Sequence, residues 1–136
     1  MKNNKQNNNK GTERLSEKDE LKIKLEKQVA LGIWIQSVGQ LIEFVSLARL
    51  NLISDEVVAN AENHILAGAS IQTIGTFLEA IGVTGEITFP DGEQHLNAQK
   101  LAVTGDWLQA LGAILEAVGG SEIIRAEQEN HELFVP

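Results

Sequence analysis

The 136-residue sequence contains no cysteine, no tyrosine and only two prolines, Pro90 and Pro136. Without cysteine the chain can form neither a disulfide nor a thiolate metal site. Because aromatic residues make up only 4% of the chain, we expect a core of Leu, Ile, Val and Ala. The scarcity of proline favours long, uninterrupted helices. The sequence begins with Lys and Asn and shows no apolar signal segment, so a cytoplasmic location is expected.

Positive charge is scarce over most of the chain. Residues 1–27 hold eight Lys or Arg and five Asp or Glu, whereas residues 28–136 hold three against 14. The acidic larger part repels nucleic acid, so we expect no nucleic-acid partner. Residues 1–14 form a Lys- and Asn-rich lead of low complexity that we expect to be disordered. Residues 15–136 are predicted to form a single helical-repeat domain.

A 15-residue unit occurs three times, at residues 32–46, 68–82 and 105–119. Counting the first residue as offset 0, Gly, Gln, Gly and Glu occupy offsets 0, 4, 7 and 11 in every copy, and offsets 3, 6, 10 and 13 are always apolar. Both spacings are typical of one face of an α-helix. Each copy therefore predicts a helix with an aliphatic face beside a polar stripe. The three polar stripes are Gly32, Gln36, Gly39 and Glu43; Gly68, Gln72, Gly75 and Glu79; and Gly105, Gln109, Gly112 and Glu116.

The stripe glycines lie a heptad apart, on nearly one line along each helix. A glycine inside a helix costs ~1 kcal/mol relative to alanine, so its presence needs a compensating contact. We expect Gly32, Gly39, Gly68, Gly75, Gly105 and Gly112 to allow close approach of a neighbouring helix. Because a buried carboxylate must be paired, we expect the stripe Gln and Glu side chains either to form hydrogen bonds between helices or to lie at a solvated rim.

The fold class predicted from these patterns is all-α. We expect an up-down-up bundle with helices over residues 16–48, 55–81 and 97–118. Ser54 and Asn97 are the expected N-caps, and Gly82 is the expected C-terminal glycine of the second helix. A helical solenoid is the alternative for a repeat near 36 residues, but each copy here supplies one long helix where solenoid repeats use two.

Two smaller elements complete the expected fold. Residues 83–96 contain the turn signal Pro90-Asp91-Gly92 after strand-like residues, which predicts a small β-hairpin or a structured loop. Gly119-Gly120 is expected to break the third helix, and Ser121 to begin a short C-terminal helix that reaches about Asn130.

Residues with chemical potential are few. Glu43, Glu79 and Glu116 are equivalent in the repeat, but no histidine follows them at the three-residue spacing that di-iron bundles use. His64 is expected to be a hydrogen-bonded, partly buried side chain. The sequence contains no nucleophile elbow, phosphate loop or zinc-ligand spacing. We therefore predict no enzyme activity, no cofactor and no metal site.

Trp34 and Trp107 share one repeat position and are expected either to pack in the core or to form a partner surface. Membrane spanning is not favoured, because the longest stretches free of charged residues, 63–78 and 28–42, are shorter than the ~20 residues that cross a bilayer. Insertion as an amphipathic segment is the alternative that remains open.

The repeat core G-x-x-[LI]-Q-x-x-G-x-x-[LI]-E-A resembles that of a family of small, repetitive, uncharacterised proteins from Bacillus-type bacteria. The likeness covers residues 29–119 and rests on the three polar stripes. The first copy departs from it at Phe44 and Ser46, where the others have Ala and Gly. The resemblance implies a bacterial, mainly helical protein and implies no activity.

These observations favour a non-enzymatic helical bundle that acts through protein–protein interaction, either as a homo-oligomer or with another protein. The alternative is a membrane-active or toxin-like protein that uses glycine-rich amphipathic helices. Membrane contact is the less favoured of the two.

Overall fold

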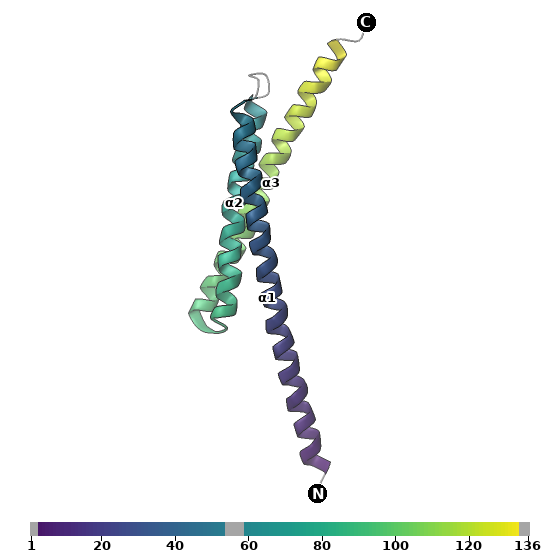
Figure 1. Cartoon of the computed structure of the whole chain (residues 1–136), viewed down its shortest axis with the longest axis vertical. Helices are drawn as coiled ribbons and strands as arrows, with labels where there is room; N and C mark the ends of the chain where they lie inside the picture. The colour runs from purple at the N-terminus through teal and green to yellow at the C-terminus, as the bar shows by residue number, and fades with distance from the viewer. Residues whose placement is uncertain (1–2, 54–58, 134–136) are drawn as a thin grey trace.

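The computed structural model describes residues 3–53 and 59–133. This part of the chain forms three α-helices, α1 (Asn3–Asn51), α2 (Ala59–Thr88) and α3 (Gly92–Leu133). The central helix is α2, which packs against both α1 and α3. Successive helices run in opposite directions (Figure 1). The prediction of an all-α bundle of three long helices is confirmed.

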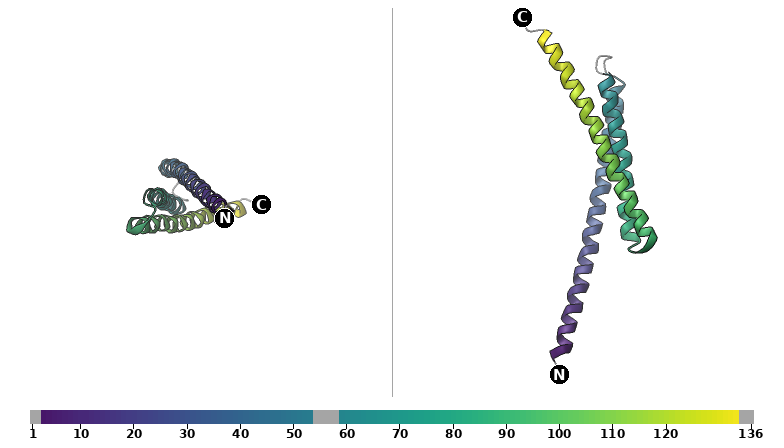
Figure 2. Two further views of the ribbon diagram at one scale, coloured as in Figure 1. Left: turned by 90° about the horizontal axis from the view of Figure 1, so that it is seen from below. Right: turned by 180° about the vertical axis from the view of Figure 1, so that it is seen from behind.

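The two outer helices are longer than the shared bundle. The N-terminal part of α1 projects past the α2–α3 turn at one end (Figure 1). The C-terminal part of α3 projects beyond α2 at the opposite end, as the view from behind also shows (Figure 2). The bundle is therefore limited to the middle of the molecule, where the three repeat copies lie.

The hairpin predicted at residues 83–96 is wrong, because no strand occurs in the described ranges 3–53 and 59–133. Instead α2 continues to Thr88, whose hydroxyl donates to the Thr84 carbonyl oxygen at 2.8 Å. The helix ends there because the residue before Pro90 is disfavoured in helical conformation. Gly92 has a φ of +85° and begins α3, which therefore starts before the expected cap at Asn97.

The short C-terminal helix is also wrong, because α3 runs through Gly119-Gly120 to Leu133 without a break. Gly119 is not a helix stop but part of the α2–α3 contact. A Cβ atom added to it would lie 2.5 Å from the Ala61 carbonyl oxygen. Gly82 likewise lies inside α2, against Ala102, rather than at its end.

Other element ends differ by smaller amounts. Helix α1 includes residues 3–14, for which composition predicts a disordered lead, and it ends at Asn51 rather than near residue 48. Before Pro90 the chain has no proline that would interrupt a helix. The expected N-cap at Ser54 lies outside the described residues.

The interior is built from small residues, so the expected core of Leu, Ile, Val and Ala is confirmed for Ala and, in the part of the chain that the structure describes, wrong for Leu and Val. Within the described residues, Ile33 is the one large aliphatic side chain that is buried. Many large aliphatic side chains, such as Ile35 and Ile42, are exposed, and others, such as Ile65, are of intermediate exposure, because helices in glycine contact leave little room between their backbones. The other buried non-glycine residues are Ala30, Ala61, Ala69, Ala80, Ala102, Ser37, Thr73 and Thr76.

Candidate functional site

The polar stripes of α2 and α3 face each other in antiparallel orientation. A Cβ atom added to Gly68 would lie 2.6 Å from the Gly112 carbonyl oxygen. One added to Gly75 would lie 2.7 Å from the Gly105 carbonyl oxygen. Real Cβ atoms do not approach backbone atoms this closely, so these four positions accept only glycine without a shift of the helices.

Glutamine and glutamate side chains bridge the same contact reciprocally. Gln72 Nε2 donates to Glu116 Oε1 at 2.6 Å, and Gln109 Nε2 donates to Glu79 Oε2 at 2.6 Å. Each glutamine at offset 4 thus bonds the glutamate at offset 11 of the other copy, while offset 0 faces offset 7. The contact is therefore symmetric, because the same repeat offsets meet when the two copies are exchanged. Both carboxylates accept a hydrogen bond from an amide donor.

The polar stripe of α1 is arranged differently. No described atom lies within 4 Å of a Cβ added to Gly32 or Gly39, so the expected helix contact at these two glycines is wrong for the single chain. Gln36 Nε2 donates to Gln109 Oε1 of α3 at 2.9 Å. Glu43 Oε2 accepts from Gln40 of its own helix at 2.9 Å. The two glycines of this stripe are therefore open, whereas Gln36 reaches α3. Glu43 also lies near α3, close enough to Glu116 for the two carboxyl groups to interact electrostatically.

The face of α1 that packs against α2 carries Ala30, Ile33 and Ser37, all buried. Ser37 Oγ donates to the Ile33 carbonyl oxygen at 2.9 Å and lies 3.3 Å from the carbonyl oxygen of Thr76. Thr73 Oγ1 lies 3.3 Å from the Gln40 carbonyl oxygen, again across the α1–α2 contact. These residues were not predicted as contacts. The available signal was offset 5, which holds a small residue in all three copies (Ser, Thr and Ala).

The two tryptophans share a repeat position but not an environment. Trp34 Nε1 donates to Thr84 Oγ1 of α2 at 3.1 Å, and its ring meets that of Phe77 edge to face, with centroids 6.3 Å apart. Trp107 on α3 is 68% exposed. Trp34 is thus part of the α1–α2 contact, whereas Trp107 is available to solvent, lipid or a partner.

The aliphatic face of the α1 repeat is exposed, and those of the α2 and α3 repeats are exposed at offsets 6 and 13 but of intermediate exposure at offsets 3 and 10. Ile35 and Ile42 of α1 are 65% and 62% exposed. On α2 and α3 the outward residues include Ile74, Leu111 and Val118. A helix that is apolar on most of its outer surface needs a cover of lipid or protein.

All three helices are long and apolar enough, by length and composition, to cross a membrane: Ser16–Asn51, Ala59–Thr88 and Gly92–His131. The prediction that membrane spanning is not favoured rests on the length of the charge-free stretches. Within these helices, the acidic side chains of Glu79 and Glu116 accept hydrogen bonds from amide groups of a neighbouring helix.

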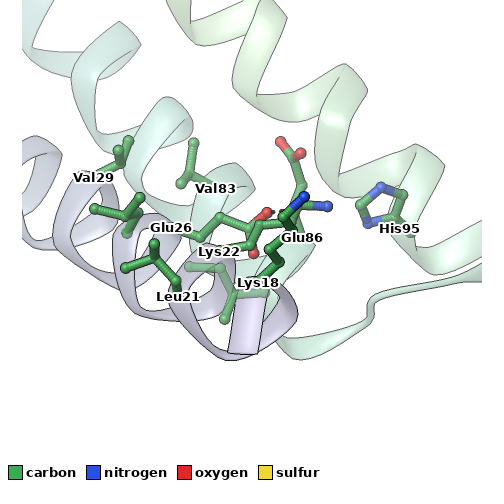
Figure 3. A pocket seen from close by; sticks show the side chains of 10 residues that line it. Lys18, Leu21, Lys22, Glu26, Val29, Val83, Glu86 and His95 are labelled. Atoms are coloured by element: carbon green, nitrogen blue, oxygen red, sulfur yellow. Dashed lines mark ion pairs between the residues drawn. The ribbon is translucent and has the colours of Figure 1, made fainter. Parts of the chain in front are cut away.

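A groove with a volume of about 440 Å³ lies where α1 passes the α2–α3 turn (Figure 3). Leu21, Leu25 and Val29 of α1 form its apolar wall, opposite Val83 of α2. Lys18 and Lys22 also line it, and Lys22 Nζ lies 3.6 Å from Glu26 Oε1. Glu26, Glu86 and His95 also line the groove, so its polar lining carries acidic as well as basic groups.

Chemically reactive groups are dispersed over the bundle. No group of three or more His, Asp or Glu side chains that could hold a metal ion occurs among the residues searched, which are those the structure describes. His64 Nδ1 lies 3.0 Å from Glu122 Oε2, so this histidine is hydrogen-bonded, although it is exposed rather than partly buried. The arrangement can join helices through side-chain hydrogen bonds.

Comparison with protein-family models, with curated proteins and with solved structures finds no match for this chain. The resemblance of the repeat to the family from Bacillus-type bacteria therefore stays a prediction.

Proposed function

We propose that this protein is a membrane-inserted helical bundle that acts by helix association rather than by catalysis. The observation that carries the proposal is the inverted placement of residue types. Apart from Ile33, the buried residues of the described ranges are glycine, alanine, serine and threonine, while many Leu, Ile and Val side chains are exposed. Membrane helices pack in this way, because small residues permit close approach and lipid covers the aliphatic side chains.

Water is a poor environment for the outer surface. Burying a Val, Leu or Ile side chain contributes roughly 1.5–3 kcal/mol, and this contribution is lost wherever such a side chain stays in water. Half-exposed or more exposed examples occur along all three helices, as Ile35, Ile74 and Ile114 illustrate. Lipid would recover this free energy without requiring a specific partner.

The polar stripe of α2 and α3 fits the same environment. Charged side chains at the centre of a membrane helix are costly and are found facing other helices. Glu79 and Glu116 face the α2–α3 contact and receive hydrogen bonds from Gln109 and Gln72. Hydrogen bonds between membrane helices contribute ~1 kcal/mol each.

Helix α1 is charged before its apolar stretch, and residues 16–27 carry four lysines and four acidic residues. Lys18, Lys22, Lys24 and Lys27 are exposed and precede the apolar stretch that begins at residue 28. Lysines next to a membrane helix interact favourably with anionic lipid headgroups.

Flotation with vesicles tests the proposal. The full chain is mixed with vesicles of phosphatidylcholine, or of phosphatidylcholine with phosphatidylglycerol, and centrifuged through a density gradient. We expect it to float with both, and we expect brominated acyl chains to quench the fluorescence of the exposed Trp107. A chain that stays at the bottom of the gradient with both vesicle types would contradict membrane insertion.

The second candidate is a water-soluble assembly that acts through protein–protein interaction, in the cytoplasmic location expected from the sequence. It is favoured by the open polar stripe of α1, where Gly32 and Gly39 are positioned for a helix that the single chain does not supply. In that case the outward aliphatic faces are covered by protein. Light scattering would then show a defined oligomer in buffer without detergent, and flotation would fail.

A further inference from the structure

We propose that the polar stripe of α1 binds the same stripe of a second copy of this chain. The two α1 helices would run antiparallel and repeat the geometry that joins α2 to α3. The inference goes beyond membrane insertion and does not depend on it, because the contact is defined by glycine, glutamine and glutamate in either medium.

The geometry follows from how the repeat pairs within the chain. In the α2–α3 contact, offset 0 faces offset 7 and offset 4 bonds offset 11. This rule makes each stripe complementary to its own antiparallel copy. Applied to α1, it places Gly32 opposite Gly39 of the second copy and lets Gln36 donate to Glu43 of the second copy.

The required groups on α1 are accessible. Gly32, Gln36, Gly39 and Glu43 are all exposed. Helix α1 meets α2 through Ser37, and Gly39 lies about 200° around the helix from it at ~100° per residue. Gln36 and Glu43 of the same stripe lie near Gln109 and Glu116 of α3. A second helix would therefore approach on the side of the glycines, away from α2 and beside α3.

Hydrogen-bonding capacity is also left over. The Gln36 amide has two N–H groups, and its bond to Gln109 engages one of them. The bond from Gln40 engages one of the two Glu43 oxygens. A bond from Gln36 to Glu43 of the second copy would thus add to the existing network.

A second copy is the occupant that the repeat itself specifies. The stripes of α2 and α3 already occupy each other, since their glycines leave no space for another helix. The repeat occurs three times in the chain, so the matching open stripe is the α1 stripe of another molecule. Its pattern of amide donors and carboxylate acceptors is complementary to that of the first.

Sedimentation velocity on the full chain, in buffer or detergent micelles, gives the first test. We expect a dimer in the wild-type chain, and we expect Gly39→Leu to weaken dimerisation by about tenfold or more, because leucine overfills the contact. Gly120→Leu is the matched control. Gly120 is also a helical glycine with no described atom within 4 Å of an added Cβ, and it lies outside the stripes. We expect this control to dimerise normally.

Disulfide formation gives the orientation, since the chain has no cysteine of its own. In the α2–α3 contact, Ile65 at offset −3 touches Gly119 at offset 14. The equivalent α1 positions are 29 and 46. A mixture of Val29→Cys and Ser46→Cys chains should form a mixed disulfide, whereas neither variant alone should form one efficiently.

Three results would overturn the proposal: a wild-type monomer at all concentrations, equal dimerisation of Gly39→Leu and wild type, or disulfides within each single variant, which would indicate parallel helices. Membrane insertion is judged separately. Gly39→Leu should still float with vesicles if insertion is correct, so loss of dimerisation and loss of flotation are distinguishable.

Discussion

At the scale of single residues, the effect of a side chain at a glycine depends on what lies opposite. Gly75 faces the Gly105 carbonyl oxygen, and an added Cβ would also lie 2.9 Å from the Gln109 amide nitrogen. Both are backbone atoms, which cannot rotate away. We therefore expect Gly75→Ala to destabilise the fold by about 1–3 kcal/mol through overpacking, despite the better helix propensity of alanine. Urea unfolding followed by circular dichroism measures the change.

Gly120→Ala is the control for this substitution, because Gly120 is helical and has open space around it. Here propensity alone should act and raise the free energy of unfolding by up to ~1 kcal/mol. Stabilisation by both substitutions would show that the α2–α3 backbones are further apart than the structure indicates.

Glu79 allows a test of the hydrogen bonds across the same contact. Glu79→Gln keeps an acceptor for Gln109 Nε2, so its effect should be small. Glu79→Leu leaves the part-buried Gln109 amide unsatisfied and should cost ~1–3 kcal/mol in the free energy of unfolding. The same leucine at Glu127, an exposed carboxylate of α3, should change stability by less than ~0.5 kcal/mol. Equal effects at the two positions would mean that Glu79 is simply solvated.

The sequence identified the stripe residues but could not assign their partners. Gly39 and Gly75 occupy the same repeat offset, yet only Gly75 lies in a contact within the chain. Gly, Gln and Glu at fixed spacing indicate that a helix face is built for close approach. They do not indicate which of three equivalent faces is used, because that choice depends on how the outer helices are arranged around α2.

At the scale of elements, Ser37 is the residue that fixes α1 against α2. It is fully buried and lies opposite the carbonyl oxygen of Thr76, which is also fully buried. We expect Ser37→Leu to separate α1 from α2, because the close contact has no volume for two more heavy atoms. In a Trp107→Phe background, Trp34 fluorescence should shift to the red as its contact with Phe77 is lost.

Ser46→Leu is the matched control on the same helix. Ser46 Oγ makes the same local hydrogen bond, to the Ile42 carbonyl oxygen four residues earlier, but the residue is exposed. Its substitution should leave Trp34 fluorescence unchanged. If both variants shift the emission equally, α1 is held by something other than the Ser37 contact.

Helix number and approximate position were predictable because heptad spacing repeats three times in the sequence. The helix ends were harder to predict, since each prediction depended on whether a single glycine ends a helix or continues it. Gly82 and Gly119 were predicted to end helices because glycine is common at helix C-termini. Both are helical, because Gly82 packs against Ala102 of α3 and Gly119 packs against Ala61 of α2. Pro90 was read as a turn correctly, while the flanking residues that seemed strand-like belong to the helices.

At the scale of the whole molecule, the lysines are concentrated in one part of the chain, since seven of the eight lie in residues 1–27. Replacing Lys18, Lys22, Lys24 and Lys27 by Gln should weaken binding to anionic vesicles by up to ~1 kcal/mol per lysine and leave binding to neutral vesicles unchanged. Vesicle co-sedimentation at two salt concentrations measures both. The control carries Lys100→Gln and Arg125→Gln and should behave as wild type. An equal loss on neutral vesicles would place the lysines in the fold rather than at a lipid surface.

The inverted placement of residue types could not have been derived from periodicity. An aliphatic face and a small polar face have the same helical spacing, and either can be the inner one. Which face lies inside depends on the surroundings. In water the aliphatic face is expected inside, as the sequence argument assumed, whereas glycine contacts such as Gly68–Gly112 place the small face inside.

The reciprocal pairing of offset 0 with 7 and of offset 4 with 11 has a consequence for the number of repeats. Polar stripes that bind in pairs are all paired when a chain has an even number of repeats. One stripe stays unpaired when the number is odd. A hairpin of two copies would be self-sufficient, and so would a chain of four. This chain has three. Because three is an odd number, one polar stripe is left without a matching stripe in the same chain. Adding or deleting a single repeat would let all stripes pair within the chain.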